Sequence, residues 1–218
     1  MPTWPEPLNG EPLRAPTDYL IYEFDEFADS FDSVLAGLGY VVPRRFGELL
    51  AVHFEGRGAH VLDLGCGTGL CGVEARPYAA HLCGVDLSPG MLERARQRGI
   101  YDTLIEAEIG RYLEQREDRF DLVFAGDSLI YFGDIARVLE SIRTVLRPNG
   151  LLFFSLELVS DDLTYFLSAS GRYQHSRAYV EATLGDSGYI LVSAESRVLR
   201  NENGLPVDGV IVVASNPG

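Results

Sequence analysis

Apolar side chains recur along this chain first with helical spacing and then in short unbroken runs. The segment "DYLIYEFDEFADSFDSVLAGLGY" carries aromatic and aliphatic residues at intervals of two to four, which predicts one or two amphipathic helices. A further helix is expected from Arg44 to Phe54, because Pro43 suits a first helical turn. Residues 19–56 are therefore expected to form a helical segment, and the proline-rich residues 1–18 an irregular arm.

From residue 59 onward, strands and helices are expected to alternate. Five runs predict strands, in the order "HVLDLG", "HLCGVDL", "DTLIEAE", "DLVFAGD" and "LLFFSLEL". Helices are expected over residues 68–76, 88–99 and 134–146, and a short one follows the third strand. Ser88-Pro89 and Gly99 mark the two ends of one of them, since these residue types favour helix starts and stops.

The end of the chain predicts a different arrangement. After an irregular stretch, Ser176 is expected to cap a helix that ends near Ser187. Two strands, "YILVSAESRVLR" and "VDGVIVVAS", then flank "NENGLP" and are expected to pair antiparallel. The whole pattern predicts an α/β fold with a doubly wound, mostly parallel seven-stranded sheet, an antiparallel last strand and helices on both faces.

Composition narrows the classes of protein that fit this pattern. A chain of 218 residues, 46% of them hydrophobic, is long enough for one domain, here expected over residues 19–218. The net charge of -14 argues against general binding to nucleic acid or to an anionic membrane. Three cysteines without CxxC spacing and four scattered histidines predict no metal site, and indicate reduced thiols in a cytoplasmic protein.

The stretch "VLDLGCGTGL" places three glycines directly after a buried strand. Ligands of doubly wound sheets bind beyond the carboxyl ends of the strands, where Gly65 and Gly67 leave room for close approach. A tight strand-to-helix connection is the simpler interpretation of such a turn. However, Asp63 precedes the glycines, and its carboxylate would repel a pyrophosphate but suit a ligand with an ammonium group.

Asp86 adds a second carboxylate at the same edge of the sheet. It ends the next strand in "GVDLSPGML", where a carboxylate can accept hydrogen bonds from both hydroxyls of a ribose. Taken alone, Asp86 could simply cap a helix. Together with "DLGCGTG", it indicates a site for a nucleoside.

Four motifs in order resemble class I methyltransferases that use S-adenosylmethionine (SAM). These are "VLDLGCGTGL", "GVDLSPGML", "FDLVFAGDSLIYFGD" and "LRPNGLLFFS", which cover residues 59–156. A narrower likeness, to bacterial methyltransferases whose family label includes TPR repeats, rests on "YEFDEFADSFDSVLAGLGYVVP", "LCGVEARPYA", "YDTLIEAE" and "GRYQHSRAYVEATL". This chain departs from that label, because no 34-residue helical repeat is expected before Asp18.

The resemblance implies SAM as cofactor, with S-adenosylhomocysteine as product, in a Rossmann-like methyltransferase fold. It implies a methionine moiety over the glycine loop, a ribose on Asp86, and adenine between the ends of the second and third strands. The residues expected to bind the cofactor are Asp63, Gly65, Cys66, Gly67, Gly69, Leu70, Asp86, Leu87, Met91, Glu108, Ile109, Gly126, Phe24 and Phe31.

The acceptor side is expected after the fourth strand and before the late helix. Asp127, Tyr131 and His175 are candidate catalytic residues, with Asp127 or His175 as a general base. Asp127 could instead cap a turn, Tyr131 could pack on a helix, and the His175 ring could satisfy a backbone group. The residues expected to bind the substrate are Tyr19, Tyr22, Phe132, Arg172 and Tyr173.

Arg172 and the N-terminal helices carry further expectations. Arg172 suits a carboxylate or phosphate on the acceptor, since a guanidinium group binds both in bidentate fashion. The N-terminal helices either dock on the sheet or, by resemblance to small-molecule methyltransferases, form a lid over the cofactor. In a lid, Phe24 and Phe31 could face the sulfonium through a cation–π contact.

The function predicted is therefore methyl transfer to oxygen or nitrogen of a small-molecule acceptor by a monomer or homodimer. A non-catalytic SAM-binding module and a methyltransferase acting on a protein or on tRNA remain alternatives. The absence of an "NPPY"-type sequence where "GDSL" stands disfavours the latter two enzymes. A nicotinamide-dependent oxidoreductase is disfavoured by Asp63 and by the GxGxG spacing, which differs from GxGxxG.

Overall fold

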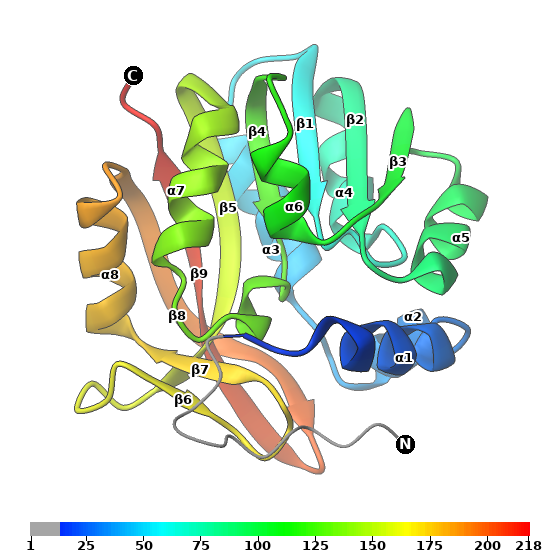
Figure 1. The fold of residues 1–218 in the computed structure, drawn as a ribbon, viewed down its shortest axis with the longest axis vertical. Coiled ribbons are helices and arrows are strands. Elements are labelled where there is room, and N and C mark those ends of the chain that lie inside the picture. Colours follow the sequence, from blue (N-terminus) through cyan, green and yellow to red (C-terminus); the bar gives the residue numbers. More distant parts are fainter. Residues whose placement is uncertain (1–13) are drawn as a thin grey trace.

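One mixed sheet forms the centre of the structure, a computed structural model that describes residues 14–218 (Figure 1). Its strands, in chain order, are β1 (Ala59–Leu64), β2 (Ala79–Asp86), β3 (Thr103–Glu106), β4 (Phe120–Ala125), β5 (Leu146–Val159), β6 (Tyr165–Leu167), β7 (Tyr173–Ser176), β8 (Ile190–Glu202) and β9 (Leu205–Ser215). Five of them run parallel in the order β3-β2-β1-β4-β5. β9 lies between β5 and β8 and is antiparallel to both.

Helices cover both faces of this sheet. They are α1 (Thr17–Phe27), α2 (Phe31–Gly37), α3 (Val42–His53), α4 (Leu70–Ala75), α5 (Pro89–Arg98), α6 (Ile109–Glu114), α7 (Ala136–Val145) and α8 (Arg177–Asp186), with 3₁₀ turns η1 (Arg76–Tyr78) and η2 (Leu129–Tyr131). α6, α7 and α8 lie on one face, and α3 and α4 on the other (Figure 1). The prediction of a doubly wound sheet with an antiparallel last strand is confirmed, but the sheet has nine strands and not the seven predicted, because β6 and β7 also belong to it.

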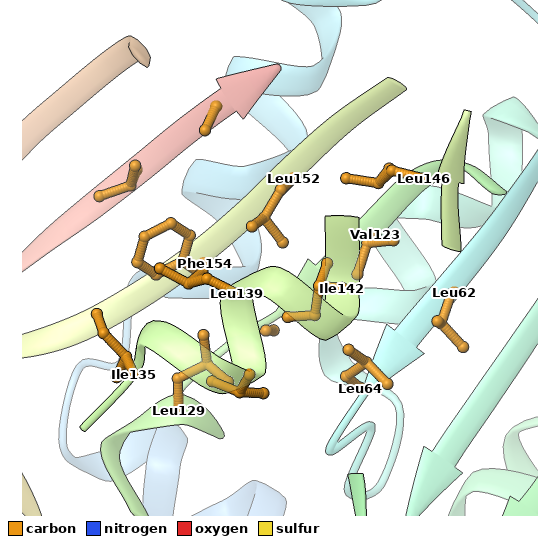
Figure 2. Packing of buried hydrophobic residues seen from close by; sticks show 14 of the residues in the cluster. Leu62, Leu64, Val123, Leu129, Ile135, Leu139, Ile142, Leu146, Leu152 and Phe154 are labelled. Atoms are coloured by element: carbon orange, nitrogen blue, oxygen red, sulfur yellow. The ribbon is translucent and has the colours of Figure 1, made fainter. Parts of the chain in front are cut away.

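Alternate positions of the buried strands supply two separate cores. On one face, Leu139 and Ile142 of α7 pack against strand residues such as Leu152 and Phe154 of β5 (Figure 2). The intervening Phe153 points to the other face, where its ring stacks on Phe124 at 5.0 Å between centroids, with Phe46 of α3 beside both. A strand covered on both faces needs apolar residues at consecutive positions, which explains the run "LLFF".

The helix ends form as their residue types predict. Ser88 Oγ accepts a hydrogen bond from the Met91 N–H at 3.0 Å, and α5 ends at Gly99 in the left-handed region. Ser176 Oγ caps α8 in the same way, and Asp134 Oδ1 accepts from the N–H of Ala136 at the start of α7. These contacts are local, and sequence alone is sufficient to find them.

β6 and β7 correct the prediction of an irregular stretch between β5 and the late helix. The two strands pair antiparallel, and β7 also runs parallel to the carboxyl end of β5, with Glu157 opposite Gln174. Each residue of β7 pairs with a residue of β5 that lies 17 positions earlier in the chain, as Gln174 does with Glu157. Because this partner is outside the segment, the local pattern gave no sign of the pairing.

The start of the described chain lies against the middle of the molecule. The Ala15 N–H donates a hydrogen bond to the Tyr131 carbonyl at 2.8 Å, and α1 begins two residues later. The predicted arm up to residue 13 lies outside the described residues. Within residues 14–218, no helix has the length and apolar character needed to cross a membrane.

Candidate functional site

A cavity of about 470 Å³ lies at the carboxyl ends of β1, β2 and β4, beneath α1 and α2. β2 and β3 follow β1 on one side of the sheet, and β4 and β5 follow on the other. The strand order therefore reverses beside β1, and ligands of such folds bind at this switch point. The residues of the three strand ends that line it are Asp63, Gly65, Cys66, Gly67, Asp86, Leu87, Gly126, Asp127 and Ser128.

The N-terminal helices cover this cavity with one apolar face. Their lining residues recur at intervals of three and four, namely Leu20, Phe24, Phe27, Phe31, Leu35 and Leu38. Neither α1 nor α2 has a buried residue, so this face lines an open space and does not pack into a core. The arrangement favours the interpretation of α1 and α2 as a lid over the other expectation, a pair of helices docked on the sheet.

Acidic residues of the lid attach it to the glycine loop and to α5. The Asp25 carboxylate accepts hydrogen bonds from Ser88 Oγ and, at 2.9 Å, from the Gly90 N–H. Asp32 accepts from Thr68 Oγ1 and pairs with the Arg98 guanidinium group. Three of these partners, Thr68, Ser88 and Gly90, directly neighbour lining residues in the sequence, so polar contacts hold the lid around its apolar underside.

The glycine loop is shaped by close packing and by Asp86. A Cβ placed on Gly65 would stand 2.4 Å from Ser128 Cβ, so only glycine permits this approach of the loops after β1 and β4. The Gly67 N–H donates to Asp86 Oδ2 at 2.8 Å, and the Ser88 N–H donates to Asp86 Oδ1 at 2.9 Å. Each carboxylate oxygen keeps lone-pair capacity toward the cavity, while burial raises the pKa of Asp86.

Asp63 is the most deeply buried carboxyl group of the cavity, with a side chain that Tyr101 contacts directly. The Tyr101 hydroxyl donates to Asp63 Oδ2 at 2.7 Å. Burial nevertheless raises the pKa of Asp63 to about 7, and the neighbouring charge of Asp86 contributes in the same direction. A ligand that brings a positive charge to this position would offset the cost of keeping Asp63 ionised.

The remaining residues expected to bind the cofactor divide into two groups. Leu70, Met91, Ile109 and Glu108 line the cavity, although the Glu108 carboxylate also caps α6 through the Gly110 and Arg111 N–H groups. Gly69 does not line it. Its backbone adopts a left-handed φ of 96° where the chain turns into α4, so this glycine is needed for the backbone conformation and not for contact with a ligand.

Asp127 lies on the opposite side of the cavity from Asp86, at the end of β4. Its backbone has a φ of 50°, a conformation that costs energy for a residue with a side chain and often marks a functional site. Ser155 Oγ donates to its carboxylate, and Arg200 donates to Asp127 Oδ2 at 2.7 Å. Burial raises the pKa of Asp127, against the opposing effect of Arg200.

Two arginines and three carboxylates form a network beside Asp127, which we name the acceptor-end cluster. Its members are Asp127, Glu157, Arg172, Arg200 and Glu202. Glu157 and Arg200 are almost fully buried, with side chains 2% and 4% exposed. The other three residues line the cavity together with Arg200.

His175 does not reach this site. Its ring is fully buried and stacks on Tyr179, with 5.9 Å between centroids. Its Nε2 lies 2.9 Å from the carbonyl oxygens of Phe132 and Gly133, and burial lowers its pKa to about 4. The prediction of His175 as a general base is therefore wrong, and the alternative, a ring that satisfies backbone groups, describes the structure.

The structure brings only some of the expected substrate-binding residues to the cavity. Phe132 and Arg172 line the cavity, and Tyr131 lines it from η2. Tyr19 lines an adjoining hollow instead. Tyr22 is exposed on the outer side of α1, and Tyr173 is fully buried against Tyr165, so the structure brings neither to the cavity.

Several residues that line or support the cavity were missed by the sequence interpretation. Tyr101 and Ser128 belong to the cofactor side, and Arg200 and Glu202 to the acceptor side. Among residues 14–218, Ser128 Oγ is buried without a hydrogen-bond partner, so it is available to a ligand. Ser128 follows directly after Asp127 and could have been suspected from that position. Nothing local distinguishes Arg200, which reaches the cavity only through the β8–β9 hairpin.

Comparisons with known proteins agree with this geometry. The family model described as "Methyltransferase domain" matches residues 62–154. Human methyltransferase-like protein 27 is 33% identical over 149 residues, which are 66% of this chain and 60% of that protein. The glycine/sarcosine/dimethylglycine N-methyltransferase of Actinopolyspora halophila is 35% identical over 109 residues, 46% of this chain and 19% of that protein. The chain thus spans less than two thirds of the length of these curated relatives.

A solved structure shows the same fold over nearly the whole chain. The [4+2]-cyclase SpnF superimposes with a TM-score of 0.75, covers 95% of this chain and 98% of its own, and is 17% identical. At that identity the likeness concerns the fold alone. That protein is named as a cyclase and not as a methyltransferase, so this fold alone does not determine the reaction.

Proposed function

We propose that this chain, whose residues 62–154 match the family model described as "Methyltransferase domain", is a class I SAM-dependent methyltransferase that transfers a methyl group to oxygen or nitrogen of a small-molecule acceptor. The observation that carries the proposal is the single cavity in which Asp63, the glycine loop and Asp86 lie beneath an aromatic lid. The relative from Actinopolyspora halophila, named for three small amino acids, supports a small acceptor.

The residues present fit SAM better than they fit a phosphate-bearing cofactor. Asp63 would hold the ammonium group, and Asp86 would accept hydrogen bonds from the ribose hydroxyls. The unpartnered Ser128 hydroxyl beside Gly65 is a further polar group for the methionine moiety. The ionised carboxylate of Asp63, directly before the glycine loop, would repel a pyrophosphate, which disfavours nicotinamide cofactors.

When bound, SAM supplies a methyl group that its sulfonium already activates. The tasks left to the chain are alignment of the acceptor and exclusion of water. The apolar underside of the lid excludes water, and the faces of Phe24 and Phe31 are available to a nearby cation. Asp127 is the carboxylate at the acceptor side that can take a proton from an acceptor, which its raised pKa favours.

Other functions predicted from the sequence differ from this one in testable ways. A non-catalytic SAM-binding module would share the cofactor site but show no turnover. A methyltransferase acting on a protein would need an open groove, whereas α1 and α2 cover this cavity. Membership of the family labelled with TPR repeats, a cytoplasmic location and a monomeric or homodimeric state remain proposals.

The first experiment is calorimetric titration of the chain with SAM, S-adenosylhomocysteine, NAD and NADP. We expect micromolar binding of the two adenosyl ligands and none of the nicotinamide cofactors. Asp86→Ala should weaken the adenosyl ligands at least about tenfold, the loss expected for one charged hydrogen-bonding group. Asp208→Ala, which removes an exposed carboxylate on β9, is the matched control and should bind like the natural chain.

Each other outcome has a definite meaning. Binding of NAD or NADP alone would overturn the assignment of Asp63 and of the glycine loop. Failure of all four ligands to bind a folded chain would overturn the proposed cofactor. Binding of the adenosyl ligands without transfer to any acceptor in a broad screen would favour the non-catalytic module.

A further inference from the structure

The acceptor-end cluster contains two arginines, but its own carboxylates already occupy them. Each of the three guanidinium nitrogens of Arg200 donates to a different carboxylate, those of Asp127, Glu157 and Glu202. Arg172 donates from Nε to Glu157 at 2.7 Å and from Nη2 to Glu202. An anionic acceptor would have to displace these charge-assisted contacts, which leaves a buried carboxylate unpaired.

The charge of the cluster also disfavours an anion. Three carboxylates face two guanidinium groups, so the carboxylates are in excess by one. A second hollow of about 380 Å³ shares Leu20, Phe24, Phe27, Tyr131 and Arg172 with the cavity. Its lining also includes two carboxylates, those of Glu23 and Glu26 on the exposed side of α1, against the one guanidinium group of Arg172. A ligand that enters from this side passes more negative than positive charge.

The surfaces around the cluster are apolar and aromatic. Phe24 and Tyr131 meet edge to face with ring centroids 5.7 Å apart, and Phe27 and Phe31 do so at 5.3 Å. Such rings bury a hydrocarbon body and attract a cation held against their faces. Aromatic walls beside an excess of carboxylate therefore match an amine on an apolar body.

We propose that the acceptor is such an amine, bound as its ammonium cation between the aromatic lid and the acceptor-end cluster, and that carboxylates and phosphates are rejected. This inference rests on the proposed function and names the substrate class of the same site. It replaces the expectation that Arg172 binds an anionic acceptor. An ammonium group must lose a proton before its nitrogen can act as a nucleophile, and Asp127 is the carboxylate placed to take it.

The test compares three probes of nearly equal shape and different charge on the chain saturated with S-adenosylhomocysteine. The probes are 2-phenylethylamine, 2-phenylethanol and 3-phenylpropanoate, titrated by calorimetry. We expect the amine to bind at least about tenfold more tightly than the carboxylate, with the alcohol between them. No turnover is needed, so the readout is independent of the activity of the loaded enzyme.

Two variants test whether the cluster causes the preference. Glu202→Gln keeps the side-chain shape and removes one carboxylate, and should reduce the amine-to-carboxylate ratio roughly threefold or more. Glu140→Gln makes the same change on the exposed face of α7 and should leave the ratio unchanged. A ratio that falls equally in both variants would contradict a local cause.

The failures of the two proposals are distinguishable. If S-adenosylhomocysteine does not bind, the proposed function fails. If it binds and the carboxylate binds as tightly as the amine, or no amine binds at millimolar concentration, the inferred substrate class is wrong while the proposed function stands.

Discussion

At the scale of single residues, Asp63 shows how a binding role conflicts with stability. Burial raises its pKa from 3.8 to about 7 although Tyr101 donates a hydrogen bond to it. A carboxyl group whose folded-state pKa is raised stabilises the fold below its unfolded-state pKa. That contribution is lost as pH rises through the folded-state value. Above about pH 7, the folded chain therefore holds a costly buried charge.

Asp63→Asn should accordingly stabilise the chain while it weakens ligand binding. The gain in the free energy of unfolding should be about 2 kcal/mol larger at about pH 8 than at about pH 5.5, since most of the titration lies between them. Denaturant unfolding at the two pH values measures this difference. A gain that is equal at both would contradict the raised pKa of Asp63.

The same carboxyl group predicts the pH dependence of cofactor binding. A ligand ammonium needs the ionised form of Asp63, so the Kd for S-adenosylhomocysteine should rise up to about tenfold per pH unit below 7. Calorimetry on the natural chain from about pH 8 to about pH 5.5 tests this. In Asp63→Asn, binding should be weak at every pH, and a steep dependence that persisted there would assign the effect to another group.

His175 is expected to act on stability and not on function. Burial lowers its pKa from 6.5 to about 4, so stability present above pH 6.5 is lost as pH falls toward 4, where the unfolded chain binds the proton first. His175→Gln should therefore lose less stability than the natural chain between about pH 7 and about pH 5, by about 2 kcal/mol. Binding of S-adenosylhomocysteine to a folded His175→Gln chain should be unchanged, and its abolition would contradict the position of the ring outside the cavity.

At the scale of elements, α1 and α2 are held by their acids more than by a core. Neither helix has a buried residue, whereas Asp25 and Asp32 contact the rim of the cavity. An element held by few exposed contacts opens at a small free-energy cost, which a lid requires. The polar contacts of Asp25 and Asp32 therefore hold the lid in place, whereas its apolar underside faces the cavity.

Replacing Asp25 and Asp32 together by alanine should open the lid without unfolding the chain. We expect S-adenosylhomocysteine to dissociate faster and its Kd to rise roughly threefold to tenfold, with a change in unfolding free energy within about 1 kcal/mol. Stopped-flow displacement and denaturant unfolding measure the two quantities. Glu93→Ala, whose contacts stay within α5, is the control and should leave both unchanged.

At the scale of the whole molecule, Arg200 joins parts of the chain that are far apart in sequence. It comes from β8 and contacts Glu157 on β5 and Asp127 after β4. The β8–β9 hairpin also hydrogen-bonds to the lid region, where the Asn201 N–H donates to the Leu38 carbonyl at 2.8 Å. The sheet, the lid and the acceptor side therefore meet at this one hairpin.

Arg200→Ala should destabilise the chain strongly, because it leaves the buried Glu157 with Arg172 as its remaining cation. The expected loss is on the order of 3 kcal/mol in the free energy of unfolding. Arg197→Ala, at a half-buried position of the same strand, should cost less than about 1 kcal/mol. Similar losses in both variants would show that the buried network contributes little beyond the strand itself.

The sequence by itself determined the alternation of elements and the cofactor side of the cavity. Apolar runs, helix caps such as Ser88 and the glycine loop are local signals, because each depends on backbone geometry within a few residues. Asp63 and Asp86 could be paired in advance because adjacent parallel strands end at the same edge of a sheet.

Only the tertiary structure decided the acceptor side. Whether His175 or Arg200 reaches the cavity depends on pairing between β7 and β5 and between β8 and β9, and such long-range pairing leaves no periodicity at the residues themselves. Whether Arg172 is free or neutralised depends likewise on carboxylates from two other strands. Local patterns reflect the conformation of a segment, whereas the electrostatics of a cavity depend on which segments meet there.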